Sequence, residues 1–481
     1  MKQVKLIKNY LYNASYQLLT LILPLITAPY VSRVLGPKGV GDYSFTYSII
    51  TWFTLITSIG IAYYGDRQVA YVRDDKYELS RTFYELQILK ICMTIISLIV
   101  FIIFINLYHH YTFLLWLQVI NILASTVDIS WLYMGLENFK ITVMRNTIVK
   151  ITTVILIFTF VRNQNDTWLY VLVIALANFL GNLTLWPTLK KILIKVNLKA
   201  LHPFMHLRES LMLFLPSIAT KVYLNLNKTV LGVIVGATAA GFYQNSDNLV
   251  QIIISIVTAT GTVVLPRAAN EFSKGNRQKI KDLLYKSFDF ISFLVFPMAF
   301  GLAAISNHLA ILFYGAKFAP VGPIMMLESI IIIFVGWSNA IGIQYLLPMN
   351  RTSDYTKSLV ISAIFSICIS LPLIVIWGVH GAMLTTVLSE GIVTLYQLFT
   401  VRHEIKLTRL FYDVPKFFIA SLVMFICVFT LGKHFTNVVM LFVNIFLGGI
   451  IYIIMLLIFK PRLLNNIKDI LKGIKASGVK S

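Results

Sequence analysis

The chain is a succession of apolar runs, each about twenty residues long, separated by short loops that carry most of the charge. Coiled as an α-helix, a run of this length spans the roughly 30 Å hydrocarbon core of a membrane. Backbone polar groups find no water inside lipid, so each run must be helical unless protein surrounds it. The pattern predicts an all-α, polytopic membrane protein with about fourteen transmembrane helices.

Composition agrees with this class and argues against a soluble enzyme. Of the 481 residues, 58% are hydrophobic and only 13% are charged, whereas soluble domains carry about 25% charged residues. The net charge of +21 is spread over many loops, so no nucleic-acid partner is expected. The three cysteines lie singly in apolar segments and predict neither a disulfide nor a metal site. The phosphate-loop, zinc-protease and hydrolase motifs do not occur, so we predict no catalytic residue and no cofactor.

Basic residues indicate the orientation in the membrane. The great majority of the 41 lysines and arginines fall in alternate loops, which the positive-inside rule assigns to the cytoplasm. Both termini and the basic stretch 190–208 then lie on the cytoplasmic side of a bacterial plasma or inner membrane. The first apolar run, at about 10–34, is too long for a signal peptide and is interpreted as a retained first span.

An internal repeat divides the chain into two halves. Gly36 to Tyr43 and Gly236 to Tyr243 both fit G-x-x-x-x-G-x-Y, and each follows a span containing a Leu-Pro pair. Such repeats predict two lobes with a substrate site at their interface. The predicted domains are an N-lobe of six spans, a basic cytoplasmic linker, a C-lobe of six spans, and a last pair of spans with an amphipathic tail, at residues 1–189, 190–208, 209–412 and 413–481.

Two stretches outside the spans have the pattern of helices on the membrane surface. In the linker, Ile192 and Leu193 alternate with lysines, and in the tail the apolar residues from Leu464 to Ile474 fall on one helical face.

Polar residues within spans are the candidate binding groups, because an ionised side chain at mid-membrane costs roughly 2.5–3.5 kcal/mol on insertion scales. Lys221, Asn225 and Lys228 share one face of the seventh span. On the eighth span, Asn248 and Gln251 lie on one face near Asp247. The lysines favour an anionic substrate in a cavity; a structural Lys–Asp pair between the two helices is the alternative.

Three further charged residues have two interpretations each. Arg33, at the end of the first span, either reaches the headgroups or turns into the cavity. Asp128 and Glu390 lie within predicted spans and act either as ion-coupling groups or as polar contacts between helices.

The opening segment carries a family resemblance. Pro24 to Pro37, followed by Gly39-Val40-Gly41-Asp42-Tyr43, strongly resembles the start of Wzx-type polysaccharide flippases of the multidrug/oligosaccharidyl-lipid/polysaccharide export superfamily. Tyr64-Gly65-Asp66-Arg67 and the second-half motif from Gly236 are similar to looser motifs of that family. The resemblance implies a transporter that flips undecaprenyl-pyrophosphate-linked oligosaccharide from the inner to the outer leaflet by alternating access, for capsule, exopolysaccharide or O-antigen synthesis.

It also implies lipid-linked oligosaccharide and membrane lipids as partners, together with a polysaccharide polymerase and glycosyltransferases. Three alternatives stay open: a peptidoglycan-lipid flippase, a drug/cation antiporter of the same superfamily, and, less favoured, a membrane glycosyltransferase or polymerase.

Overall fold

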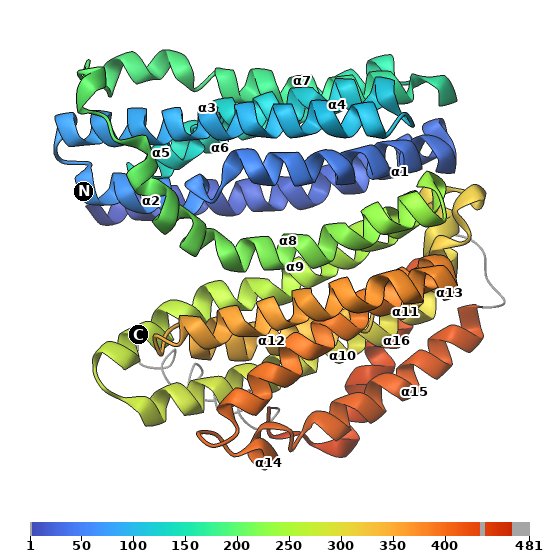
Figure 1. Ribbon diagram of the computed structural model, residues 1–481. Helices are drawn as coiled ribbons and strands as arrows, with labels where there is room; N and C mark the ends of the chain where they lie inside the picture. The colour runs from blue at the N-terminus through green and yellow to red at the C-terminus, as the bar shows by residue number, and fades with distance from the viewer. Residues whose placement is uncertain (1, 433–437, 464–481) are drawn as a thin grey trace. The chain divides into compact units, whose positions relative to one another are not determined.

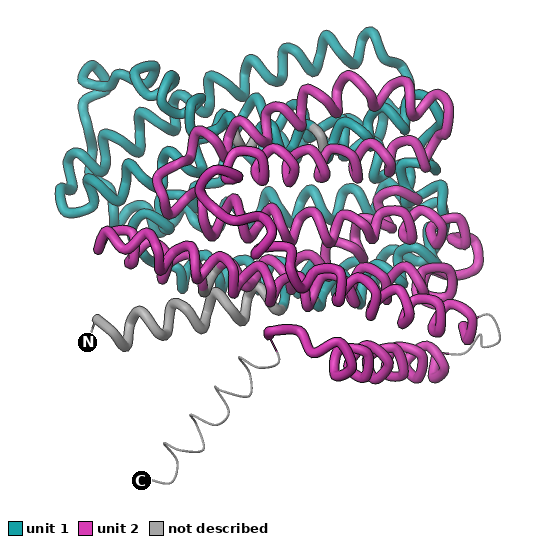
Figure 2. The backbone as a smooth tube through the Cα atoms, turned by 90° about the horizontal axis from the view of Figure 1, so that it is seen from below, with its two compact units in different colours: residues 1–241 teal, residues 242–481 magenta. Residues whose placement is uncertain are grey.

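The computed structural model describes residues 2–432 and 438–463, and within these ranges the chain contains helices and connecting loops but no strand. It forms two compact units, residues 1–241 and 242–481 (Figure 2). The predicted all-α class is confirmed. The amphipathic tail predicted around Leu464–Ile474 lies outside the described residues.

Unit 1 consists of long helices with several short ones at its turns (Figure 1). In chain order its elements are α1 (Lys2–Ser58), α2 (Ile61–Val72), α3 (Lys76–Leu107), α4 (Thr112–Val127), α5 (Ser130–Gly135), α6 (Phe139–Phe160), η1 (Gln164–Asp166), α7 (Thr167–Leu183), η2 (Trp186–Lys191), η3 (Leu198–Ala200), η4 (Pro203–His206) and α8 (Leu207–Ile234).

Unit 2 begins inside α9 and includes one π-helical segment, η6. Its elements are α9 (Ala237–Ser273), α10 (Arg277–Tyr314), η5 (Ala316–Phe318), α11 (Val321–Glu328), α12 (Ile331–Ser338), η6 (Asn339–Leu346), α13 (Thr352–Val401), α14 (Leu407–Leu410), α15 (Val414–Gly432) and α16 (Val438–Phe459).

Among the described residues, 11 helical segments are long and apolar enough to cross a membrane. Two of them, Ile22–Val72 and Thr352–Val401, are 51 and 50 residues long, whereas one crossing needs about 20. Gly36 and Gly378 interrupt these two segments with non-helical backbone, so each is long enough to cross twice. The count of fourteen spans stays a prediction.

Side chains are distributed as a membrane protein requires. Large apolar residues are exposed along the outer helices, as on α16, where Val439, Phe442 and Phe446 are 71%, 67% and 70% exposed. Polar side chains are buried between helices, among them Gln118 and Lys90. A surface of this kind would aggregate in water but is solvated by lipid chains.

Unit 1 contains a broken helix in which side chains bond three of the freed carbonyl groups. Between α4 and α5, the carbonyl oxygens of residues 126, 127 and 128 accept hydrogen bonds from Gln87 at 3.0 Å, Trp186 at 2.8 Å and Lys90 at 2.7 Å. The Asp128 carboxylate accepts from the backbone N–H of Ser130 at 2.9 Å, at the start of α5. Non-helical backbone persists at membrane depth because protein groups replace the missing helical bonds.

The repeated glycines have two structural roles: the first of each motif has a positive φ, and the second allows a close backbone approach. Gly36 and Gly236, the first of each motif, have φ of 70° and 120°, a region that other residues adopt at a cost. Gly41 and Gly241, the second of each motif, pack against each other within unit 1. A Cβ on Gly241 would lie 2.8 Å from the Cα of Gly41.

The prediction that the linker forms a helix on the membrane surface is wrong. Residues 186–206 form three short 3-10 turns joined by extended backbone. Ile192 and Leu193 pack against the hydrophobic core of unit 1 together with the buried Leu189, because that core is available nearby. Helix α8, assigned from the sequence to the second half, belongs to unit 1; the lobe boundaries at 189 and 209 stay a prediction.

The glycine contact gives a stability prediction. In Gly41→Ala the new methyl would overlap the carbonyl group of Ala237, so we expect a loss of roughly 1–3 kcal/mol of stability. In Gly36→Ala the new methyl meets only the Gln164 side chain at 3.9 Å, an ordinary contact, but the residue keeps a positive φ, and the variant should lose about 1–2 kcal/mol. Gly449→Ala is the control, since nothing lies within 4 Å of its Cβ position. Thermal unfolding in detergent ranks the three; a Gly41→Ala protein as stable as Gly449→Ala would contradict the packing role.

Candidate functional site

The polar face of α8 packs on the second half of α1. The Asn225 side-chain amide donates to the Ser48 carbonyl at 2.7 Å, and Thr229 donates to the Ser48 hydroxyl at 3.0 Å. Trp52 donates in turn to Thr229 at 3.0 Å. Asn225 therefore has a structural partner, and this face of α8 is fixed by hydrogen bonds within unit 1.

The two lysines of this stripe differ in their surroundings. Lys221 is exposed and makes no hydrogen bond or ion pair with another described residue. Lys228 is half-buried and, unlike Lys221, interacts with another residue. The helix spacing predicted from the sequence is confirmed, because both residues lie in the uninterrupted α8. Their role in binding stays a prediction.

The predicted face of α9 is organised by contacts along the helix itself. Gln251 donates to Asp247 at 3.1 Å, and Gln244 donates to Asn248 at 2.7 Å. Both pairs are four residues apart, as expected for neighbours on a helix surface. Asp247 has a further interaction. These amides and the carboxylate lie at neighbouring positions on one helix of unit 2.

The remaining predicted residues belong to other elements than these two helices. Arg33 is exposed and Glu390 is buried at 8% exposure. Thr394, one turn after Glu390, donates to the Phe334 carbonyl at 2.9 Å, so this face of α13 contacts α12. The Asp128 carboxylate accepts a hydrogen bond from the backbone N–H of Ser130 at the start of α5. Roles in ion coupling for Asp128 and Glu390 stay predictions.

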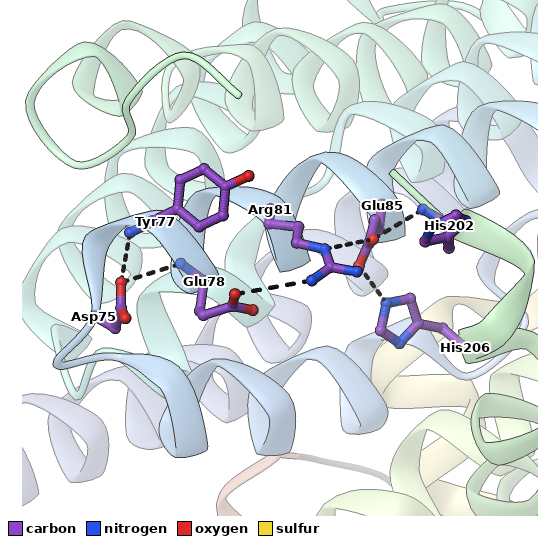
Figure 3. Close-up of polar contacts among 7 residues, drawn as sticks. All are labelled: Asp75, Tyr77, Glu78, Arg81, Glu85, His202 and His206. Carbon is purple, nitrogen blue, oxygen red and sulfur yellow. Dashed lines mark hydrogen bonds and ion pairs between the residues drawn. The ribbon is translucent and has the colours of Figure 1, made fainter. Parts of the chain in front are cut away.

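The sequence analysis missed a polar cluster around the buried Glu85 on α3 (Figure 3). Glu85, 2% exposed, contacts Arg81 on its own helix and His206 at the end of η4. The available signal was spacing: Arg81 and Glu85 are four residues apart, as are His202 and His206. Arg81 and Glu85 share a face of α3, but nothing in the sequence joins this pair to the histidines.

Two apolar cavities flank α15 in unit 2. One, of about 400 Å³, is lined by α10, α11, α12 and α15, with Phe300, Ile333 and Phe425 in its wall. The other, of about 380 Å³, lies among α9, α10, α15 and α16, and Asn444 is a polar residue in its wall. Cavities of this size and lining accommodate hydrocarbon chains rather than sugars.

Within the ranges 2–432 and 438–463, no group of three or more His, Cys, Asp or Glu side chains is placed to hold a metal ion.

Comparison with known proteins identifies a matching family and similar transporters. A family model described as "Polysaccharide biosynthesis protein" matches residues 6–272. A "Putative O-antigen transporter" of Escherichia coli K12 is 23% identical over 415 residues, covering 84% of this chain and 98% of that protein. The "Lipid II flippase MurJ" of Bacillus subtilis is 25% identical over 162 residues, covering 33% of this chain and 29% of that protein.

A solved structure of similar fold is that of "Lipid II flippase MurJ, inward closed conformation", with a TM-score of 0.75 at 18% identity over 95% of this chain and 100% of that one. At this identity the likeness shows the fold, a polytopic transporter fold. The resemblance read from the opening segment is confirmed by the family model, which spans more than half of the chain, and the protein therefore belongs to the polysaccharide biosynthesis protein family.

Proposed function

We propose that this protein is a flippase that moves undecaprenyl-pyrophosphate-linked oligosaccharide units from the inner to the outer leaflet by alternating access. The observation that carries the proposal is the similarity to the E. coli putative O-antigen transporter along 98% of that protein's length. The cargo then belongs to the synthesis of an O-antigen, capsule or exopolysaccharide. A polymerase and glycosyltransferases acting on the same lipid-linked units are the expected partners.

Each part of this cargo has a chemically matched surface in the chain. The pyrophosphate is an anion, and the exposed ammonium of Lys221 on α8 offsets part of the cost of taking it out of water. The sugar hydroxyls match the amides of Asn248 and Gln251 on α9. The apolar cavities beside α15 have room for part of the lipid chain.

A peptidoglycan-lipid flippase is the second candidate, because the lipid II flippase structure shares the fold at a TM-score of 0.75. Sequence similarity favours the first candidate: the match covers 98% of the O-antigen transporter but 29% of the B. subtilis lipid II flippase. A drug/cation antiporter is expected to use acidic cavity groups, whereas the stripe on α8 is basic. Depleting cells of the protein distinguishes the first two, since only a peptidoglycan-lipid flippase is essential for the wall.

Our first functional prediction concerns depletion of the protein. Assembly of oligosaccharide on the lipid should continue, and the lipid-linked product should accumulate while surface polysaccharide disappears. Extraction of lipid-linked glycans and immunoblotting of surface polysaccharide measure the two pools. Undiminished surface polysaccharide in cells without a redundant flippase would exclude the proposal, and arrested wall synthesis would favour the second candidate.

Our second functional prediction concerns Lys221 and Lys228. They are seven residues apart, about 10 Å along the helix, so a pyrophosphate passing outward can contact one and then the other. Replacing either with Gln removes a charge-assisted hydrogen bond of about 1.5–3 kcal/mol, and export should fall by roughly 10- to 100-fold at unchanged protein abundance. Lys→Arg keeps the charge and should retain partial activity.

Lys76→Gln is the matched control, since Lys76 is exposed at the start of α3, away from the stripe. The structural Lys–Asp alternative makes a different prediction: Lys→Gln would lower protein abundance, and Asp247→Asn would restore it. Normal export by the Lys221→Gln, Lys228→Gln double variant would remove both residues from the mechanism.

Our third functional prediction concerns orientation. The clustering of basic residues in alternate loops assigns the C-terminus to the cytoplasm. A fluorescent reporter fused after Ser481 should therefore fluoresce, and an alkaline phosphatase fused there should be inactive. The opposite pair of signals would require an odd number of spans.

A further inference from the structure

The start of α15 and the end of α16 meet at a buried carboxylate of unit 2; both helices are labelled in Figure 1. Asp413 directly precedes α15 and is 1% exposed. Its Oδ1 lies 2.7 Å from the ammonium of Lys416, in the first turn of α15, and its Oδ2 accepts a hydrogen bond at 2.9 Å from the backbone N–H of Arg462, just after α16. These contacts replace the water that the carboxylate has lost. The residues Arg409, Tyr412, Asp413, Lys416 and Arg462 are here called the junction.

Two cations of the junction share the ring of Tyr412, a residue that is 53% exposed. The guanidinium carbon of Arg462 lies 3.6 Å from the ring centroid, and the ammonium of Lys416 lies 5.2 Å from it, both within the range of cation–π attraction. Lys416 already pairs with Asp413, whereas the Arg462 guanidinium forms no ion pair with any carboxylate in residues 2–432 and 438–463. Stacking on the ring fixes the plane of the guanidinium and leaves N–H donors at its edge, a geometry that suits a phosphate.

A third cation, Arg409, extends the junction towards α10. Its guanidinium carbon lies 4.3 Å from the centroid of the Tyr285 ring, and its side chain, 50% exposed, is 3.4 Å from Asp282. The backbone N–H of Lys406 donates to the Tyr285 hydroxyl at 2.8 Å, so the segment before α14 is held at the same ring. Arg409 is therefore placed on an aromatic side chain, as Arg462 is.

The exposed charge at the junction is mainly positive. Basic residues that lie in or beside it and are exposed are Lys406, Arg409, Lys460 and Arg462. The carboxylates near them are those of Asp282, Asp289 and Asp413. Asp413 is buried, Asp289 is half-buried, and Asp282 pairs with Arg409. A ligand that approaches from outside meets cations first, so the surface favours an anion.

Exposed apolar side chains begin next to the junction on both helices. Phe418 and Ile419 on α15 are 43% and 44% exposed, and Leu457 and Ile458 on α16 are 57% and 63% exposed. Basic groups, an exposed tyrosine and apolar side chains thus follow one another along the chain, which is the order expected at the boundary of a bilayer. The positive-inside rule assigns this end of α15 and α16 to the cytoplasmic leaflet, where anionic lipids attract basic residues.

We propose that the junction binds the phosphate of an anionic phospholipid, with Arg462 as its main contact and Tyr412 as the residue that positions Arg462. The lipid chains lie along the exposed apolar side chains of α15 and α16, and the phosphate replaces part of the hydration of the guanidinium. The pyrophosphate of a lipid-linked cargo has similar chemistry, but the junction adjoins the lipid-exposed surface of these helices, and we assign it to phospholipid. This inference does not depend on the proposed function, because lipid binding is measured without transport.

Quenching of a tryptophan by brominated lipid tests the site. Tyr412→Trp places a reporter in the junction and keeps an aromatic face for Arg462. The chain has 7 native tryptophans at other positions, and the unaltered protein measures their background. The full-length protein is reconstituted in phosphatidylcholine vesicles that contain a minor fraction of phosphatidylglycerol, with bromine on the chains of one lipid or the other. We expect a relative binding constant of roughly 10 in favour of phosphatidylglycerol.

Variants in the same background assign the preference to Arg462. Arg462→Gln should bring the relative binding constant to within about twofold of equal binding, because a charge-assisted hydrogen bond is worth about a factor of 10 or more. The backbone N–H that bonds Asp413 is retained, so the variant should fold. Arg462→Lys keeps the charge without the planar fork and should keep part of the preference. Lys274→Gln is the matched control: it removes the same charge from a side chain that is 61% exposed in the loop after α9, and it should leave the preference unchanged.

Several outcomes would overturn the proposal. Equal quenching by the two brominated lipids would show that the junction does not select an anionic headgroup. An unchanged preference in Arg462→Gln, or an equal loss in Lys274→Gln, would show attraction to the basic surface as a whole. Undecaprenyl pyrophosphate, added in a separate arm, should displace phosphatidylglycerol only in proportion to its share of the lipid; displacement far beyond that share would assign the junction to the cargo instead.

A second measurement keeps Tyr412 in place. Native mass spectrometry of the detergent-purified protein should show that phosphatidylglycerol is retained in preference to phosphatidylcholine, and that Arg462→Gln retains less of it than the unaltered protein does. Equal retention by the two proteins would contradict the assignment to Arg462.

Discussion

The absence of water around a membrane-embedded backbone is the constraint on which the rest of the structure depends. Each place where a helix is interrupted needs substitute hydrogen-bond partners. At the α4–α5 break, Gln87, Lys90 and Trp186 donate to three freed carbonyls. The Asp128 carboxylate accepts from the backbone N–H of Ser130 at the start of the next helix. Polar side chains that resemble binding groups in the sequence thus serve first to hold the backbone together. This is why a charged residue inside a span is insufficient evidence for a substrate site.

Glycine residues allow the tight turns and close helix contacts that the structure also requires. Gly36 and Gly236 turn the chain at positive φ, and Gly41 and Gly241 allow two helices to meet with no side chain between them. Gly60 does the same for the start of α8. Helix α8 follows directly on His206, which contacts Glu85 of α3, and it belongs to unit 1. The start of the helix that carries the basic stripe is therefore held by contacts unrelated to its lysines.

Much of the candidate site was accessible from the sequence because helical periodicity is local. Lys221, Asn225 and Lys228 do share a helix, and Gln251 and Asp247 do interact four residues apart. What periodicity could not supply was the partner across the interface: Asn225 bonds Ser48, a residue 177 positions earlier. The helix in the linker was predicted wrongly for the same reason, since Ile192 and Leu193 fit a membrane surface and a protein core equally well.

The sequence by itself determined the all-helical membrane class and the positions of the repeated glycine motifs. Each of these follows from properties of neighbouring residues: the length of an apolar run, its period, and the lack of a Cβ. Only the tertiary structure decided which polar groups pair, as Glu85 does with His206 from 121 residues away. Such pairing is set by the packing of whole helices, because a buried carboxylate bonds whichever donors the fold brings within about 3 Å.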